Sequence, residues 1–154
     1  MTHNFPISIL IADDDADDRM LIEDAFEENG ISNQIHFVED GEQLLDFLRR
    51  EGDFSEHAAE PLPRLILLDL NMPKVDGRTA LAAIKEDPAL NQIPVVILTT
   101  SRADTDISKA YALGVNSFIS KPLSFDGLVS IVNAIGNYWI DTVALPNIES
   151  SNST

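Results

Sequence analysis

Four polar or charged groups stand directly after separate apolar runs of the chain. Asp69 follows LILL, the pair Asp13-Asp14 follows ILIA, Thr99 follows VVIL, and Lys121 comes just after FIS. Such runs are typical of strands that are buried on both faces of a parallel sheet. Because the carboxyl ends of parallel strands share one edge of the sheet, we expect these side chains to converge on one crevice.

Acids, a hydroxyl and an ammonium around one carboxylate suit the transfer of a phosphoryl group. A carboxylate oxygen of Asp69 can attack phosphorus and hold the group as an acyl phosphate. The approach of two anions requires a divalent cation, and Mg²⁺ prefers one or two carboxylates together with phosphate oxygens and water. We expect Asp14 and Asp69 to bind it, with Asp13 binding directly or through water. Lys121 would contact a phosphoryl oxygen as a compact charge, and Thr99 would donate a hydrogen bond to one.

The apolar runs alternate with helical patterns along the chain. Strands are predicted at residues 7–12, 35–38, 64–69, 94–99 and 116–119. Apolar stripes of helical period predict helices at residues 16–28, 41–50, 78–85, 105–113 and 124–140. Five strand–helix units in this order predict a three-layer α/β domain around a five-stranded parallel sheet.

The length of 154 residues favours one domain, which we place at residues 1–146. Residues 52–63 are polar and aperiodic and predict a lengthened surface loop, and residues 147–154 have the composition of a disordered tail. The chain has no cysteine, which excludes disulfides and thiolate metal sites. It also shows neither a signal-peptide pattern nor a membrane-spanning run, so a cytoplasmic protein is the simplest interpretation.

The charge of the chain excludes two classes of partner. Twenty-six acids against ten bases give a formal net charge of −16. Binding to a nucleic-acid backbone depends on cationic side chains, and so does docking on an anionic membrane. We therefore expect neither nucleic acid nor a membrane as a partner.

Four motifs, in order and at fitting distances, resemble those of two-component response-regulator receiver domains: ILIADDD, LILLDLNMPKVDG, PVVILTTS and FISKP. The resemblance covers about residues 7–141 and implies a doubly wound (βα)5 flavodoxin-like fold. It implies that Asp69 is the phosphoacceptor, that Mg²⁺ is the cofactor, and that the partner is a histidine kinase or a phosphotransfer domain. It further implies that the backbone carbonyl of Asn71 binds the metal and that Phe118 is the aromatic switch. Receivers also commonly have a cis peptide bond after the lysine that Lys121 matches.

Two neighbouring threonines compete for one role. Strand pleating sends Thr99 and Thr100 to opposite sides, and the spacing from Asp69 in receivers selects Thr99. Receivers usually have Ala, Gly or Ser where this chain has Thr100. We therefore expect the larger side chain of Thr100 to alter access to the phosphoryl group.

The acids after the first predicted strand divide between two roles. Asp13 and Asp14 are assigned to the metal, whereas Asp17 and Asp18 are assigned to a helix N-terminus, where acids complement the helix dipole. A shift of one residue, which would bring Asp15 into the site, stays open, although Asp13 is the acid that directly follows the strand.

The last predicted helix has a wider apolar arc than packing on one side requires. Its apolar residues are Phe125, Leu128, Val129, Ile131, Val132, Ile135 and Trp139. We therefore predict a homodimer through the surface of the fourth helix, fifth strand and fifth helix, which phosphorylation would switch. The alternative is that residues 143–146 fold back over this arc.

A second resemblance concerns a subgroup of receivers. The ending YWIDTVALP, the run LTTSRAD, the loop at residues 52–63 and the expected lack of an output domain resemble stand-alone, chemotaxis-regulator-like receivers. Within this subgroup, the chain most resembles the regulators that are paired with phytochrome-type histidine kinases, a class of kinases that includes bacteriophytochromes. A phytochrome-type partner is therefore implied by this resemblance.

Three rival functions fit the sequence less well. A haloacid-dehalogenase-like phosphatase also uses an Asp nucleophile and Mg²⁺, but it needs an acid two residues later, where this chain has Asn71. An FMN-binding module needs a phosphate-cradling loop rich in Ser, Thr or Gly where this chain has ADDDADD. A degenerate receiver would lack key positions that are all present here. We expect a signalling protein rather than an enzyme, with chemistry confined to its own phosphorylation and dephosphorylation.

Overall fold

The computed structural model describes residues 8–30, 34–52, 54, 62–72, 74–100, 104–122 and 124–137. Its strands are β1 (Ser8–Ala12), β2 (Gln34–Val38), β3 (Leu65–Leu68), β4 (Val95–Thr99) and β5 (Ser117–Ser120). Its helices are α1 (Ala16–Glu28), α2 (Gly41–Arg49), α3 (Gly77–Glu86), α4 (Asp104–Ala112) and α5 (Phe125–Ile135). Each predicted strand boundary agrees with the observed one to within a residue.

The strands form one parallel sheet in the order β2-β1-β3-β4-β5. Every residue of β3 and β4 is buried, which explains why their sequences are uninterrupted runs of Leu, Ile and Val. From β1 the chain proceeds outward to β2 and then returns to the other side of β1 as β3. The strand order therefore reverses between β1 and β3, and such a switch point opens a crevice at the carboxyl ends of the two strands.

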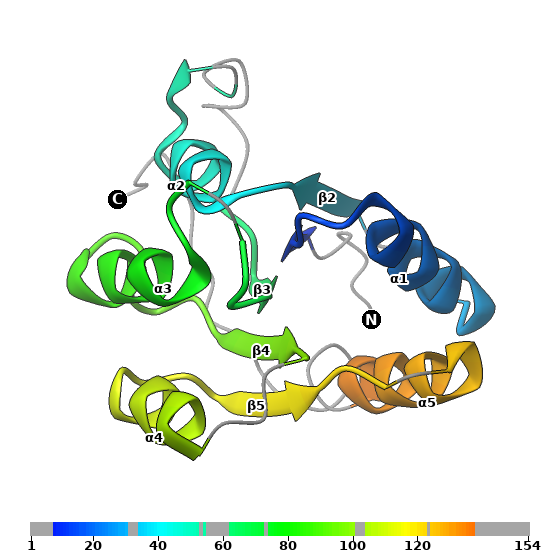
Figure 1. Ribbon diagram of the computed structural model, residues 1–154. Coiled ribbons are helices and arrows are strands. Elements are labelled where there is room, and N and C mark those ends of the chain that lie inside the picture. The colour runs from blue at the N-terminus through cyan, green and yellow to red at the C-terminus, as the bar shows by residue number, and fades with distance from the viewer. Residues whose placement is uncertain are drawn as a thin grey trace.

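Helices cover both faces of the sheet, with α1 and α5 on one side and α2, α3 and α4 on the other (Figure 1). The α1/α5 side contains one cluster of buried side chains, which includes Ile9, Phe26 and Val132. The opposite side contains a second cluster, to which Leu44 and Leu81 belong. The predicted three-layer doubly wound (βα)5 architecture is confirmed.

The apolar arc of α5 is covered in part by α1, which the sequence pattern did not anticipate. Leu128, Val132 and Ile135 are buried in the cluster that α5 shares with α1. The side-chain amide of Asn29, at the end of α1, donates to the carbonyl of Val129 at 3.1 Å and accepts from the amide of Asn133 at 2.9 Å. The sheet and the neighbouring helix α1 therefore both contact α5.

The α-helix α5 ends at Ile135, before the predicted end, and Gly136 follows it. Gly136 keeps right-handed helical dihedral angles, φ −61° and ψ −46°, and residues 136–137 continue as a π-helical turn. The predicted continuation over residues 138–140, most of the loop at 52–63, the segment at 143–146 and the tail at 147–154 lie outside the described residues. Among the helices of the described ranges, none has the length and apolarity that crossing a membrane would require.

Candidate phosphoacceptor site

Asp69 is the first residue after β3 and is almost completely buried. Its Oδ1 accepts a hydrogen bond from the hydroxyl of Thr99 at 2.8 Å and a second from the backbone N–H of Asn71 at 3.0 Å. The backbone is turned sharply here, because Gly77 packs directly against the carbonyl of Asp69, where a Cβ would overlap it. The chain after Asp69 therefore bends back on itself and holds the carboxylate at the sheet edge.

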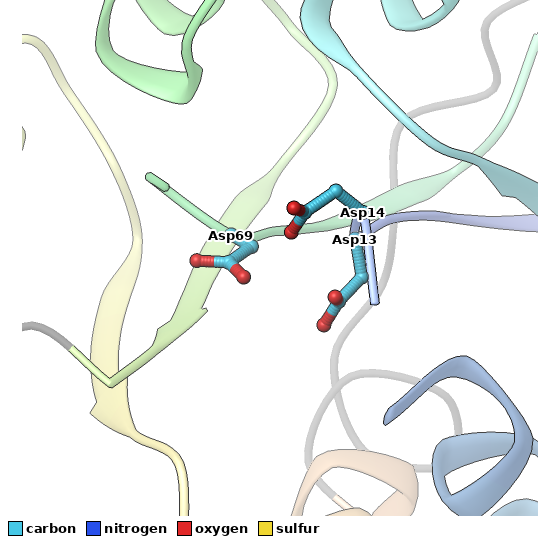
Figure 2. Close-up of side chains that lie close together, drawn as sticks. All are labelled: Asp13, Asp14 and Asp69. Carbon is cyan, nitrogen blue, oxygen red and sulfur yellow. The ribbon is translucent and has the colours of Figure 1, made fainter. Parts of the chain in front are cut away.

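Three carboxylates from two neighbouring strand ends gather at the switch point (Figure 2). Asp13, Asp14 and Asp69 each present an oxygen that lies within 4.8 Å of the others. Asp13 is buried, whereas Asp14 is exposed. Asp15 has a different role, since its carboxylate caps α1 by accepting from the N–H groups of Asp17 and Asp18. The capping role separates Asp15 from the three acids that lie together, and the assignment of the metal to Asp13 and Asp14 stays a prediction.

Lys121, directly after β5, reaches into this acidic cluster. Its Nζ donates to Asp13 at 2.6 Å, to Asp18 at 2.9 Å and to Asp69 at 3.1 Å. The lysine side chain is only 10% exposed, so these are short-range contacts in a largely dry environment. The backbone N–H of Lys121 donates to the carbonyl of Thr99, which fixes the end of β5 beside the end of β4.

Burial and the sharing of one ammonium by several acids shift the pKa values of Asp13 and Lys121. Burial raises the pKa of Asp13 above its ordinary value, although its hydrogen bond with Lys121 opposes the rise. Burial alone would lower the pKa of Lys121, but hydrogen bonds to Asp13 and Asp18 and the charges of Asp13 and Asp69 outweigh it and raise that pKa. One ammonium therefore serves several carboxylates at once. An additional cation would stabilise the cluster.

Asp18 is a member of the site that sequence reasoning missed. It was assigned only to the dipole of α1, but its carboxylate also pairs with Lys121. A periodicity argument could have found it, because Asp18 lies one turn before Ile22 on the stripe of α1 that faces the sheet. Arg19 was missed as well, and its guanidinium donates to the backbone carbonyl of Asp13 at 2.7 Å.

The remaining predicted residues, Thr99, Thr100 and Phe118, lie on or next to β4 and β5. Thr99, the last residue of β4, is fully buried and faces Asp69, whereas Thr100 lies just beyond the strand and is exposed. Phe118 is half-buried and packs against the cluster beneath α2, α3 and α4. The described residues contain no cis peptide bond, so the expected cis bond between Lys121 and Pro122 is wrong. A proline makes the cis form accessible but leaves trans favoured by about 0.5–1 kcal/mol.

A cavity of about 250 Å³ lies next to the site, between α1 and α5. Asp18, Thr100 and Lys121 line the end of the cavity that adjoins the acidic cluster. Its apolar lining includes Leu21 and Phe125, which are among the exposed large hydrophobic residues of the described chain. Lys121 therefore borders both the acidic cluster and this cavity.

Residues 9–133 match the response regulator receiver domain. The chain belongs to this family. It is 44% identical over 135 residues to the probable methanogenesis regulatory protein FilR2 of Methanothrix harundinacea, an alignment covering 88% of this chain and 84% of FilR2. It is 38% identical to the response regulator Rcp1 of Synechocystis, with 93% of this chain and 95% of Rcp1 covered.

Solved receiver structures have the same fold. The phosphorylated cyanobacterial phytochrome response regulator RcpA superposes with a TM-score of 0.85 at 40% identity, over 92% of this chain and 99% of RcpA. The Mn²⁺-bound form of Rcp1 superposes with a TM-score of 0.84 at 38% identity, over 92% of this chain and 99% of that one. This receiver domain is therefore related to stand-alone, phytochrome-associated response regulators.

The donor set of this receiver domain fits a hard divalent cation. Carboxylate oxygens are the ligands that such cations prefer, and the three carboxylates of Asp13, Asp14 and Asp69 are close enough to share one. Three acids share the single positive charge of Lys121, so this lysine does not neutralise them all, and a further cation would be favourable there. The site thus combines the carboxylate of Asp69, a candidate cation site and the cationic side chain of Lys121.

Proposed function

We propose that this chain is a single-domain response regulator that accepts a phosphoryl group on Asp69 from a histidine kinase or a phosphotransfer domain. One observation carries the proposal. The two oxygens of Asp69 face different partners, Thr99 and Asn71 at Oδ1 and Lys121 at Oδ2. A phosphoryl group joined to this carboxylate would have a hydroxyl, a backbone N–H and an ammonium within reach.

The proposed phosphoryl transfer replaces a P–N bond with a P–O bond. A carboxylate oxygen of Asp69 attacks the phosphorus of a phosphohistidine, so that a new P–O bond forms as the P–N bond breaks. The electron pair of the broken bond stays on the imidazole nitrogen, which takes a proton from solvent. Hydrolysis later returns the carboxylate, when water attacks the same phosphorus and inorganic phosphate leaves.

Mg²⁺ is the proposed cation. Asp13, Asp14 and Asp69 would hold it with the backbone carbonyl of Asn71, and the ion would neutralise the charge of the incoming phosphoryl group. The Mn²⁺ in the Rcp1 structure supports a divalent cation in a related protein. Lys121 would move its contact from the Asp69 carboxylate to a phosphoryl oxygen, and Thr99 would donate to another.

The output we propose is a change of the α4-β5-α5 surface that promotes partner binding or homodimerisation. Thr99 would follow the phosphoryl group, and Phe118 would shift in response, because it lies on the strand next to β4. A direct connection supports this route. The backbone N–H of Phe118 donates to the hydroxyl of Tyr111 on α4 at 3.1 Å, so a movement of β5 would reach α4.

A phytochrome-type histidine kinase is the proposed partner. The relatedness to RcpA, whose structure is that of a phytochrome response regulator, supports this partner.

Phosphatase activity is not proposed for the chain itself. A phosphatase of the haloacid-dehalogenase type would need an acid where Asn71 stands, and the amide of Asn71 lies 3.5 Å from the hydroxyl of Thr99. The cytoplasm is the proposed location, because a histidine kinase would deliver the phosphoryl group there.

The test is phosphorylation by acetyl phosphate and Mg²⁺, followed by peptide mass mapping and size-exclusion chromatography. We expect one phosphoryl group per chain on the peptide that contains Asp69, none on Asp69→Asn, and a larger hydrodynamic size after phosphorylation. Transfer from a purified phytochrome-type kinase, compared with kinases of other sensor classes, tests the partner. Label on Asp69→Asn at the wild-type stoichiometry would refute the proposal, as would sustained turnover of phosphate esters.

A further inference from the structure

The ammonium of Lys121 is divided between two kinds of carboxylate. Asp13 and Asp69 belong to the candidate cation site, whereas Asp18, on the first turn of α1, does not. An ammonium has three N–H donors, and these three acids use all of them. Asp69 is the most distant of the three from Nζ, at 3.1 Å. The two acids on the β1–α1 segment therefore make the two shortest contacts with the ammonium and share it with Asp69.

Asp18 holds Lys121 from the solvent side. The Asp18 side chain is 37% exposed, compared with 8% for Asp69, and it lines the cavity between α1 and α5 together with Lys121 and Thr100. Its carboxylate therefore lies at the open border of the site. A negative charge at this position also repels an approaching phosphoryl group.

We infer that Asp18 restrains Lys121 and thereby slows phosphoryl transfer to Asp69 and shortens the life of the phosphorylated state. The inference rests on the proposed function and adds a regulating residue to it. Asp18 is a positioning residue, because it acts through Lys121. Two effects have the same direction: Asp18 competes with the phosphoryl oxygens for the ammonium, and its charge opposes theirs.

The experiment compares Asp18→Asn with the wild-type protein at saturating Mg²⁺ and acetyl phosphate. Intact-protein mass spectrometry follows the uptake of the phosphoryl group and, after the donor is removed, its loss. We expect Asp18→Asn to take up the phosphoryl group roughly tenfold faster and to lose it roughly tenfold more slowly than the wild type. Such a change in rate corresponds to the free energy of about one charge-assisted hydrogen bond. Thermal unfolding is measured in parallel, and Asp18→Glu, which keeps the carboxylate, should restore rates close to those of the wild type.

Asp17→Asn is the matched control. It removes the same charge from the same helical turn, but the backbone N–H of Asp17 is bonded to Asp15 and its carboxylate has no contact with Lys121 among those the structure describes. Unchanged or slower uptake in Asp18→Asn would overturn the inference, and so would equal acceleration in Asp17→Asn. A wild-type protein that takes up no phosphoryl group at all would instead overturn the proposed function, so the two failures are distinguishable.

Discussion

The hydroxyl of Thr99 lies 2.8 Å from Oδ1 of Asp69, at the ends of neighbouring strands. Thr99 has no exposed surface, and Asp69 is 6% exposed, so the hydrogen bond is protected from water. A hydrogen bond to a charged group in such a place stabilises the fold and orients the carboxylate. The pair links Asp69 to β4, and β4 links it to β5.

Thr99→Val should lower the free energy of unfolding by about 1.5–3 kcal/mol, because Asp69 loses a buried charge-assisted partner. Denaturant unfolding measures the loss. Thr100→Val is the matched control, because the same change at the exposed neighbour should have an effect of about 0.5 kcal/mol or less. If the two variants were equally stable, the Thr99–Asp69 bond would contribute nothing measurable.

Asp14→Asn should weaken binding of Mg²⁺ while leaving the metal-free fold intact. Asp14 is exposed, so its replacement has little effect on packing. Mg²⁺ at about one hundred times its dissociation constant should stabilise the wild-type protein by about 2.7 kcal/mol, and most of this should be absent in the variant. Thermal unfolding with and without Mg²⁺ measures the difference.

Asp15→Asn is the control for that experiment. It removes the same charge one residue away, and asparagine is as good a helix N-cap as aspartate, so α1 should keep its cap. Stabilisation by Mg²⁺ should therefore survive in Asp15→Asn. Equal loss in both variants would mean that the cation responds to general charge rather than to Asp14 as a ligand.

Gly77→Ala should impair the site as well as the fold. A Cβ at Gly77 would overlap the carbonyl of Asp69 and the Cα of Leu70, so the backbone that carries Asp69 must move. Overpacking of this kind costs about 1–3 kcal/mol. Phosphorylation by acetyl phosphate should slow as well, since a misplacement of about 1 Å can cost roughly a hundredfold in rate.

Gly30→Ala is a destabilised control for that variant. Gly30 has φ +68° and no neighbour within 4 Å of an added Cβ, so alanine there meets only backbone strain of about 1–2 kcal/mol. Gly30 follows the end of α1 that is remote from the site. Its replacement should lower stability without slowing phosphorylation. Equal slowing in both variants would attribute the effect of Gly77→Ala to instability alone.

The features that could be predicted from sequence are those that depend on one element at a time. Uninterrupted apolar runs identify buried parallel strands, and a polar residue after each run must then lie at the shared carboxyl edge. This logic brought Asp69, Thr99 and Lys121 together correctly. It depends only on strand direction, and all five strands are parallel.

The features that were missed depend on how two elements pack. An acid in the first turn of a helix satisfies a local rule about dipoles, so Asp18 was assigned to the dipole of α1. The helical period places Asp18 on the sheet-facing stripe, but only the packing of α1 against the sheet brings its carboxylate to Lys121 at the end of β5. The arc of α5 likewise identified apolar residues but not what covers them, and α1 turned out to contact part of it. The homodimer remains a prediction, and Phe125, at 38% exposure, is the residue of α5 best placed to test it.

Thr100→Ala should shorten the life of phosphorylated Asp69. Thr100 is exposed and lines the cavity that Lys121 also borders, so its side chain takes up space at an opening next to the ammonium. A smaller side chain would admit water more readily to the phosphorus, and a change of roughly 0.7 kcal/mol in the barrier would accelerate hydrolysis about threefold. Loss of phosphate after removal of the donor measures the rate. Leu21→Ala, at another exposed residue that lines the same cavity, is the control, and an unchanged rate in Thr100→Ala would show that Thr100 does not limit access.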